Sequence, residues 1–182
     1  MPPSNAVAAR DPLSQLRGPF TALGLATALV VCVLDQASKL WLLYGFDLAE
    51  RGRVALAPVV ELVLVRNYGI SYGWFQWLGG SARWALLALT AVAVVFLVAW
   101  LARAGSRLSG LALGLIIGGA LGNAIDRLTQ AGAVIDFVRL HVAVGGVDRD
   151  WYVFNLADAA IVAGVVGLLY ESVRPDRAAK VP

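Results

Sequence analysis

The sequence is poor in the residues that build disulfides and transition-metal sites. Its 182 residues include one cysteine, Cys32, and one histidine, His141. A single cysteine cannot form an internal disulfide bond, and it excludes a metal site made of several thiolates. Zinc sites draw on several His or Cys ligands, so one here would consist mostly of carboxylates. The sequence therefore predicts no metal and no cofactor.

Charged residues are also scarce. They make up 15% of the chain, whereas hydrophobic residues make up 59%. Soluble domains are closer to one half apolar and one quarter charged, so this composition predicts an integral membrane protein of one domain. The net charge of +3 suits anionic lipid headgroups. Few aromatic residues are interleaved with the basic ones, which argues against nucleic acid as a partner.

Four long apolar runs organise the chain. At about 1.5 Å per residue, a helix of roughly 20 residues crosses the hydrocarbon core of a bilayer. The first run is interrupted by Asp35 and Lys39 and is longer than the apolar part of a cleavable signal peptide, which favours an uncleaved transmembrane helix. The predicted spans cover about residues 20–44, 83–102, 108–125 and 153–170.

The segments between these runs have other compositions. Val59–Val65 is rich in Val and Leu and follows Pro58, which predicts a strand. Residues 128–152 contain several glycines and are predicted to form a loop. The expected fold class is an all-α membrane protein of four transmembrane helices with a small extracytoplasmic β element. Residues 1–18 are expected to form a disordered basic leader, residues 19–172 the transmembrane domain, and residues 173–182 a cytoplasmic tail.

Four spans would place both chain ends on one side of the membrane. Arg and Lys residues mark the cytoplasmic side, but both sides carry equal numbers of them in this sequence. The segments on the side of the chain ends are shorter, so their density of positive charge is higher. We therefore expect both termini in the cytoplasm of a bacterial cell and the loops before the second and fourth spans outside the inner membrane.

The third predicted span carries glycines at every fourth position. Gly110, Gly114, Gly118 and Gly122 share one helix face, and Asp126 is the next residue in the same register. A stripe of small residues lets another helix approach closely. Close helix packing and an acidic group are therefore expected on the same side of this helix.

Two acidic residues, Asp136 and Asp158, lie beside apolar runs, where ionised groups are costly and usually face a bundle interior or a wet cavity. Two carboxyl groups held close together share one proton, so that one can act as a base and the other as an acid. A pair of this kind can hydrolyse a peptide bond without a metal. The alternative is structural: Asn155 and Asp158 have the spacing of a helix cap, and Asp136 could be a turn residue.

Further charged and polar residues are spaced four apart in the predicted helices. Asn123 and Arg127 share a helix face, where the arginine could hold a carboxylate or phosphate group or simply form a helix-end ion pair. Asp35 precedes Lys39 by four residues, which is the favourable order for a helical ion pair. Both pairs could support a site or only the packing of helices.

Two other functions share some of these residues. Gly69–Gly73 fits the pattern G-x-S-x-G, and Ser71, Asp136 and His141 follow the chain order of a serine hydrolase. That motif needs an alternating β/α fold, which the sequence does not predict. A proton-coupled carrier could use Asp35, Asp126 and Asp136 as a relay, although the broken helices and inverted repeat common in carriers are missing.

Taken together, the motifs resemble those of the signal peptidase II family, the bacterial lipoprotein signal peptidases. The matching segments run in the family's order from the first predicted helix to the last. They are Asp35-Gln36-Ala37-Ser38-Lys39, Asn67-Tyr68-Gly69, Gly119 to Arg127, Val134-Ile135-Asp136-Phe137 and Phe154 to Ile161.

The resemblance implies a four-helix membrane aspartyl protease with a small extracytoplasmic β element, and we expect this protein to be a monomer. The implied reaction removes the signal peptide from prolipoproteins at the N-terminal side of a diacylglyceryl-modified cysteine, so the partners are that substrate and membrane lipids. It places catalysis on Asp136 and Asp158. The supporting positions are Asp35, Lys39, Asn67, Asn123, Asp126, Arg127 and Asn155. The leader 1–18 matches no feature of the family, and the segment 138–152 fits it less neatly because it is long and rich in glycine.

Overall fold

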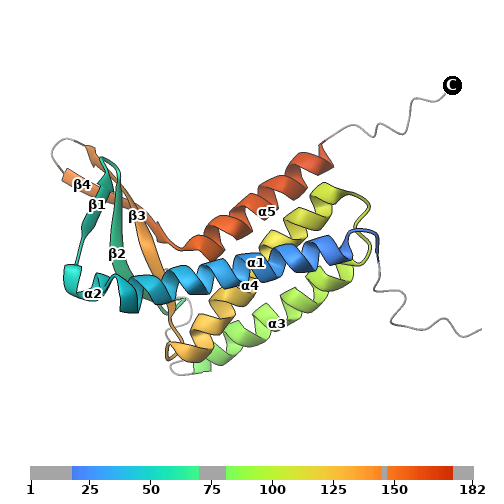
Figure 1. Cartoon of the computed structure of the whole chain (residues 1–182), viewed down its shortest axis with the longest axis horizontal. Helices are drawn as coiled ribbons and strands as arrows, with labels where there is room; N and C mark the ends of the chain where they lie inside the picture. Colours follow the sequence, from blue (N-terminus) through green and yellow to red (C-terminus); the bar gives the residue numbers. More distant parts are fainter. Residues whose placement is uncertain (1–17, 70–80, 145–146, 174–182) are drawn as a thin grey trace, which may run out of the picture.

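The computed structural model describes residues 18–69, 81–144 and 147–173. The predicted leader up to residue 17, Ser71 and the tail from residue 174 lie outside the described residues. In Figure 1 a bundle of helices occupies one end of the molecule and a small twisted sheet the other. The first helix begins and the last helix ends at the end of the bundle away from the sheet.

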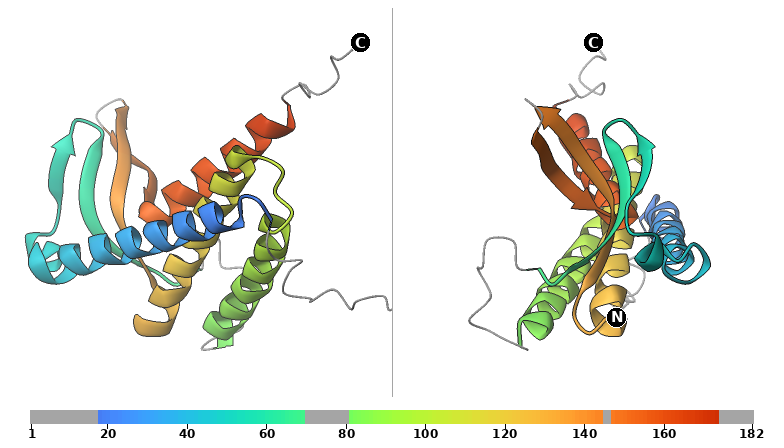
Figure 2. Two further views of the ribbon diagram at one scale, coloured as in Figure 1. Left: turned by 45° about the vertical axis from the view of Figure 1, so that its right-hand side comes forward. Right: turned by 90° about the vertical axis from the view of Figure 1, so that its left-hand side faces the viewer.

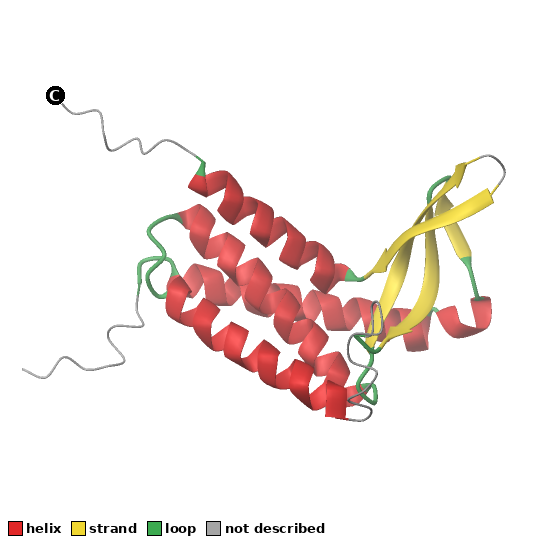
Figure 3. Cartoon of the chain, turned by 180° about the vertical axis from the view of Figure 1, so that it is seen from behind, coloured by secondary structure: helices red, strands yellow, loops and turns green. Residues whose placement is uncertain are grey.

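Four long helices form the bundle, one at each place where the sequence predicts a span (Figure 3). They are α1 (Thr21–Leu40, extended by the π-helical turn η2, Trp41–Gly45), α3 (Ala82–Leu101), α4 (Arg107–Thr129) and α5 (Leu156–Ser172). The segments Thr21–Gly45, Ala82–Leu101 and Arg107–Thr129 are long and apolar enough to cross a membrane. Three predicted spans are thus confirmed as apolar helices of sufficient length. The fourth is not, because α5 has 17 residues.

Large apolar side chains cover the outside of the bundle. Val92 and Val95 of α3 are 69% and 70% exposed, whereas Leu101 and Leu113 inside the bundle are fully buried. A soluble bundle would place polar residues on that outer surface. The apolar exterior therefore fits a helix surrounded by lipid.

The glycine stripe of α4 packs against α1. A Cβ atom on Gly114 would lie 2.4 Å from the carbonyl oxygen of Gly24, and one on Gly118 would lie 2.5 Å from that of Ala28. Further along, a Cβ on Gly122 would lie 2.6 Å from Oδ2 of Asp35. Only glycine allows these approaches. The predicted close packing is confirmed, and the partner is a helix of the same chain.

The sheet is larger than the sequence suggests. Its strands β1 (Val54–Ala57), β2 (Val60–Asn67), β3 (Val134–Val144) and β4 (Val147–Phe154) form an antiparallel sheet in the order β1-β2-β3-β4. The strand predicted at Val59–Val65 is confirmed as β2. The loop predicted at 128–152 is wrong, because β3 and most of β4 lie within it, whereas the predicted small β element is present as this sheet. The segment contains several glycines, which suggested turns. Its Val, Ile and Phe residues nevertheless form strands, because β2 provides a strand edge with which β3 can pair.

An apolar cluster joins the sheet to the bundle. Leu42 of η2, Leu48 of the short helix α2 (Leu48–Arg51) and Phe137 of β3 are all buried against one another. This contact fixes the start of β3 beside the end of α1. Figure 2 shows β3 and β4 rising from the helix ends, with the chain passing from β4 into α5. The beginning of β3 and the beginning of α5 consequently meet at one place.

Candidate active site

Asn155 caps helix α5. Its side-chain oxygen accepts the backbone N–H of Asp158 at 2.9 Å, and Oδ2 of Asp158 accepts the backbone N–H of Asn155 at 3.2 Å. This reciprocal arrangement satisfies two N–H groups that the helix itself leaves without partners. The structural interpretation of the Asn155–Asp158 spacing is therefore correct, but it accounts for only part of what these residues contact.

The side-chain nitrogen of Asn155 points toward β3. It lies 2.7 Å from Oδ1 of Asp136, 3.1 Å from Oδ1 of Asn123 and 3.2 Å from the carbonyl oxygen of Ile135. Asn155 is fully buried, so its orientation is fixed by these contacts. One asparagine thus connects the start of α5 with β3 and α4.

Asp136 lies inside strand β3, so the prediction that it could be a turn residue is wrong. Its side chain is 2% exposed, and Nδ2 of Asn67 donates to its Oδ2 at 3.0 Å. Burial raises the pKa of Asp136 to about 6, and the negative charge of Asp158 adds to this rise, while the hydrogen bonds from Asn67 and Asn155 oppose it. The raised pKa favours a neutral carboxyl group at this position.

Asp158 is the less buried acid of the two. Nδ2 of Asn123 donates to its Oδ1 at 2.8 Å. Asn123 also accepts a hydrogen bond from Asn155, which in turn donates to Asp136. The two acids are therefore linked through two asparagines that contact each other. The structure therefore brings together the two aspartates that the sequence singles out, from a strand and from a helix end.

A buried ionic cluster of Asp35, Lys39 and Asp126 lies next to the linked aspartates and asparagines. Nζ of Lys39 lies 2.7 Å from Oδ2 of Asp35, 2.9 Å from Oδ2 of Asp126 and 3.3 Å from Oδ1 of Asn123. All three charged side chains are at most 3% exposed. The lysine thereby compensates acids from α1 and α4 that would be costly to bury alone.

Each acid of the cluster also holds a backbone segment of the site. Oδ1 of Asp35 accepts the N–H of Ala157 at 3.0 Å, in the first turn of α5. Oδ2 of Asp126 accepts the N–H of Ile135 at 2.9 Å, directly before Asp136. The cluster thus positions the two segments that carry Asp158 and Asp136.

Gln36 completes the cluster and was not among the predicted site residues. Its Nε2 donates to Oδ1 of Asp126 at 2.8 Å and to the carbonyl oxygen of Gly122 at 3.1 Å. Its position next to Asp35, inside a polar interruption of an apolar helix, is the sequence signal that could have identified it.

Arg127 follows Asp126 on α4. Its Nη1 donates to the carbonyl oxygen of Asn123 at 3.4 Å. Among the described residues, its buried Nε has no hydrogen-bond partner. The negative charges of Asp158, Asp126 and Asp136 stabilise its positive charge against the cost of burial. Arg127 therefore lies close to the acids as a buried positive charge and does not line either of the pockets beside them.

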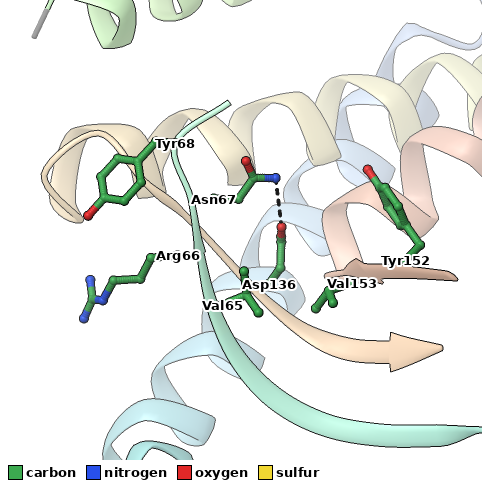
Figure 4. A pocket seen from close by; sticks show the side chains of 7 residues that line it. All are labelled: Val65, Arg66, Asn67, Tyr68, Asp136, Tyr152 and Val153. Atoms are coloured by element: carbon green, nitrogen blue, oxygen red, sulfur yellow. Dashed lines mark hydrogen bonds between the residues drawn. The ribbon is translucent and has the colours of Figure 1, made fainter. Parts of the chain in front are cut away.

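Two hollows open at the acids. A cavity of about 360 Å³ beside Asp136 is lined by Val65, Arg66, Asn67, Tyr68, Asp136, Tyr152 and Val153 (Figure 4). A groove of about 380 Å³ beside Asp158 is lined by Tyr152, Phe154, Asp158, Ala159, Val162 and Ala163.

Tyr152 belongs to both hollows and was also missed by the sequence analysis, since it lay in the predicted loop. Burial and the negative charges of Asp158 and Asp136 raise the pKa of Tyr152 above its ordinary value. The phenol therefore stays neutral near both acids.

The serine hydrolase arrangement gains no support. His141 follows Asp136 by five residues on β3, a separation of about 17 Å along a strand. Its Nε2 lies 3.6 Å from Oε1 of Glu61 on β2. Ser71 lies outside the described residues. In the described part of the chain, no group of three or more His, Cys, Asp or Glu side chains is placed to hold a metal ion.

The carrier hypothesis gains no support either. Asp35 and Asp126 are both engaged by Lys39, whereas Asp136 is bonded to the amides of Asn67 and Asn155. The three acids therefore have different partners and do not form one continuous acidic relay.

Comparisons with known proteins agree with the resemblance found in the sequence. A family model described as Signal peptidase (SPase) II matches residues 27–174. A lipoprotein signal peptidase of Rhodopseudomonas palustris is 54% identical over 160 residues, which cover 88% of this chain and 97% of the relative. One of Nitrobacter hamburgensis is 55% identical over 159 residues, covering 87% of this chain and 96% of the relative.

Solved structures share the fold. A bacterial membrane enzyme solved by the in meso method superposes with a TM-score of 0.71 at 22% identity, covering 91% of this chain and 96% of the other. A second such structure gives a TM-score of 0.68 at 22% identity and covers 87% of this chain and 97% of the other. The arrangement of helix bundle and antiparallel sheet is therefore common to these proteins.

Proposed function

The chain belongs to the signal peptidase II family, and on that premise we propose that it is an aspartyl endopeptidase acting at the membrane. It removes the signal peptide from prolipoproteins, cutting on the N-terminal side of a diacylglyceryl-modified cysteine. Asp136 and Asp158 are the catalytic pair of this proposal. The single observation that carries it is the link between the two carboxyl groups through Asn155 and Asn123, at the junction of a cavity and a groove.

The surroundings of the two acids suggest how they divide the work. Asp136 is buried and its pKa is raised to about 6, so it holds the shared proton. Asp158 occupies the first turn of α5, where the helix dipole favours a negative charge. In this mechanism Asp158 removes a proton from water while the water oxygen attacks the peptide carbonyl carbon. Asp136 gives its proton to the carbonyl oxygen.

The second half of the reaction reverses the roles. Asp158, now protonated, donates to the leaving amide nitrogen as the C–N bond breaks, and Asp136 recovers its proton from the tetrahedral hydroxyl group. Products are a carboxylic acid and an amine, and the pair returns to its starting state. The positive charge of Arg127 lies near both acids and supports them electrostatically during these steps.

The orientation in the membrane follows the same proposal. Helix α5, about 26 Å long, is the fourth span, since its outer surface is apolar at Val162, Val166 and Leu169. The sheet then lies at the outer surface of the inner membrane, and both chain ends lie in the cytoplasm. The glycine stripe of α4 is occupied by α1, which supports a monomer.

Cleavage of a lipidated precursor by the purified protein tests this function directly. We expect a rate in excess chelator equal to the rate without it, since two carboxyl groups and water suffice for the reaction. Mass spectrometry of both fragments would locate the cut. A precursor left intact by the wild-type protein, or a rate that collapses in chelator and returns with a divalent cation, would contradict the proposal.

The pH dependence provides a second test. Because the folded-state pKa of Asp136 is raised to about 6, its contribution to stability is present at low pH and is lost as pH rises through about 6. Activity that needs the neutral form should fall in the same direction, so kcat/KM is expected to decline above about pH 6. The melting temperature should fall between about pH 4 and pH 6 in the wild type and change less in Asp136→Asn. A kcat/KM that rises between about pH 6 and pH 8 would contradict the assignment of the proton to Asp136.

A further inference from the structure

The hollows beside the two acids differ in chemistry. The cavity beside Asp136 is lined by polar side chains of β2, including Arg66 and Asn67, and Figure 4 shows them on the side opposite Tyr152. The groove beside Asp158 contains no other charged residue in its lining. Tyr152 forms the boundary between them. A molecule that reaches both acids would therefore meet charged and amide groups among apolar ones on one side of Tyr152, and an almost wholly apolar surface on the other.

The groove follows one face of α5. Asp158, Ala159, Val162 and Ala163 are spaced i, i+1, i+4 and i+5, so they line the same side of the first two turns. The small side chains of the two alanines leave room between the helix and strand β4. The facing wall consists of Tyr152 and Phe154, whose rings stack with centroids 6.4 Å apart. Together they line an open apolar trough of about 380 Å³ beside Asp158.

The trough opens on the membrane-facing side of the helix. Val162 is 62% exposed, and Val166, one turn further along the same face, is 57% exposed. In a bilayer this surface lies against lipid tails. A hydrocarbon chain could therefore enter the trough sideways from the bilayer and run along α5 up to Asp158.

We propose that this trough binds one acyl chain of the lipid carried by the precursor, so that residues Ala159, Val162 and Ala163 select substrates by their lipid. The inference rests on the proposed function, since it assumes that a lipid-bearing peptide is cut at Asp136 and Asp158. The peptide then occupies the cavity beside Asp136, the acyl chain occupies the trough, and Tyr152 separates the two parts of the substrate.

Such a site would act by positioning the peptide part of the substrate relative to the two acids. Lipid tails in the bilayer are already as apolar as the trough, so moving an acyl chain into it gains little from the hydrophobic effect. A chain held along α5 would instead fix the attached peptide relative to the two acids, and small displacements of a reacting group lower rates strongly. We therefore expect the trough to affect kcat/KM for lipidated substrates far more than membrane binding.

Filling the far end of the trough tests the inference. In Ala163→Phe, the added ring would occupy the space lined by Ala163 and Val162. We expect kcat/KM to fall about tenfold or more for a precursor with long acyl chains, and less than about twofold for the same peptide with two-carbon acyl groups. The matched control is Val92→Phe, which adds a ring to the lipid-facing surface of α3, where Val92 is 69% exposed. The control should cut both precursors at the wild-type rate.

The short-chain precursor also shows whether Ala163→Phe is folded and active. Equal losses on both precursors, or no loss on either, would overturn the inference while leaving the protease proposal intact. If neither precursor is cut by the variant, a second measurement decides. Asp136→Asn is loaded with a precursor carrying a photoreactive group at the end of one acyl chain. Cross-links within residues 159–163 support the trough, and cross-links confined to α1 or α3 refute it.

The proposed function can fail separately. Wild-type protein that leaves the long-chain precursor intact, or Asp158→Asn that cuts it normally, would reject the aspartyl protease proposal. The cross-linking pattern would still report whether an acyl chain lies in the trough.

Discussion

Asp136→Asn is expected to lower kcat for cleavage of a lipidated precursor by about 10³-fold or more. Positioned acids and bases contribute about 10²–10⁴-fold to catalysis, and an amide can neither give nor take the proton that the pair shares. The same loss is expected for Asp158→Asn. Because the two acids act as a unit, the double variant should be hardly slower than either single variant. The measurement is single-turnover cleavage with precursor and enzyme in the same detergent or lipid.

The loss should occur without loss of the folded structure. The amide introduced by Asp136→Asn has nearly the shape of the carboxyl group it replaces, and its oxygen can still accept one of the two amide bonds that the acid accepts. Each such bond contributes about 1 kcal/mol, so the melting temperature should change by only a few degrees. Binding of the precursor should also persist.

Asp47→Asn is the matched control. It makes the same chemical change at an exposed acid with a left-handed backbone (φ 52°), a conformation that asparagine tolerates well. Its turnover should equal that of the wild type. Normal turnover by Asp136→Asn or by Asp158→Asn would remove the basis of the proposed mechanism.

Lys39→Met is expected to destabilise the fold by about 3–5 kcal/mol. The methionine fills a similar volume, but it leaves Asp35 and Asp126 buried without the positive charge that lies 2.7 and 2.9 Å from them. Removing one partner of a buried ion pair typically costs this much, because the remaining charge is uncompensated. For a protein of this size the melting temperature should fall by roughly 10 °C. Activity should fall as well, since the two acids also hold the backbone of Ala157 and Ile135.

Two further variants separate charge from packing. Arg103→Met removes a positive charge from an exposed position at the end of α3, and its stability should change by no more than about 0.5 kcal/mol. The triple variant Asp35→Asn, Lys39→Met, Asp126→Asn removes the unpaired charges together, so it should recover part of the lost stability. A triple variant less stable than Lys39→Met alone would show that the lysine acts through packing and not through charge.

Features with a local signal were predicted well. Helix composition and period located α1, α3 and α4 and aligned the glycine stripe with Asp126 on one face. A period of 3.6 residues is a property of a single segment, so it can be recognised without knowing the partner. The short polar motifs also identified the residues that lie together around Asp136 and Asp158. The roles of those residues in catalysis stay a prediction.

Features that depend on distant segments were predicted poorly. Residues 134–154 were expected to be mostly loop, because their glycines suggested turns. Yet β3 pairs with β2, and the register joins Val65 to Asp136, two residues far apart in the sequence. Strand formation there requires a neighbouring edge. Tyr152 was missed for the same reason, since its place between the two hollows exists only when β4 pairs with β3.

Composition and spacing alone thus establish which residues carry charge inside an apolar chain and which helix faces can pack closely. What those charges do depends on the folded arrangement. Burial raises the pKa of Asp136, Lys39 compensates two acids from different helices, and two asparagines join the remaining pair. Each of these effects depends on distances between atoms far apart in the chain, which no local pattern contains.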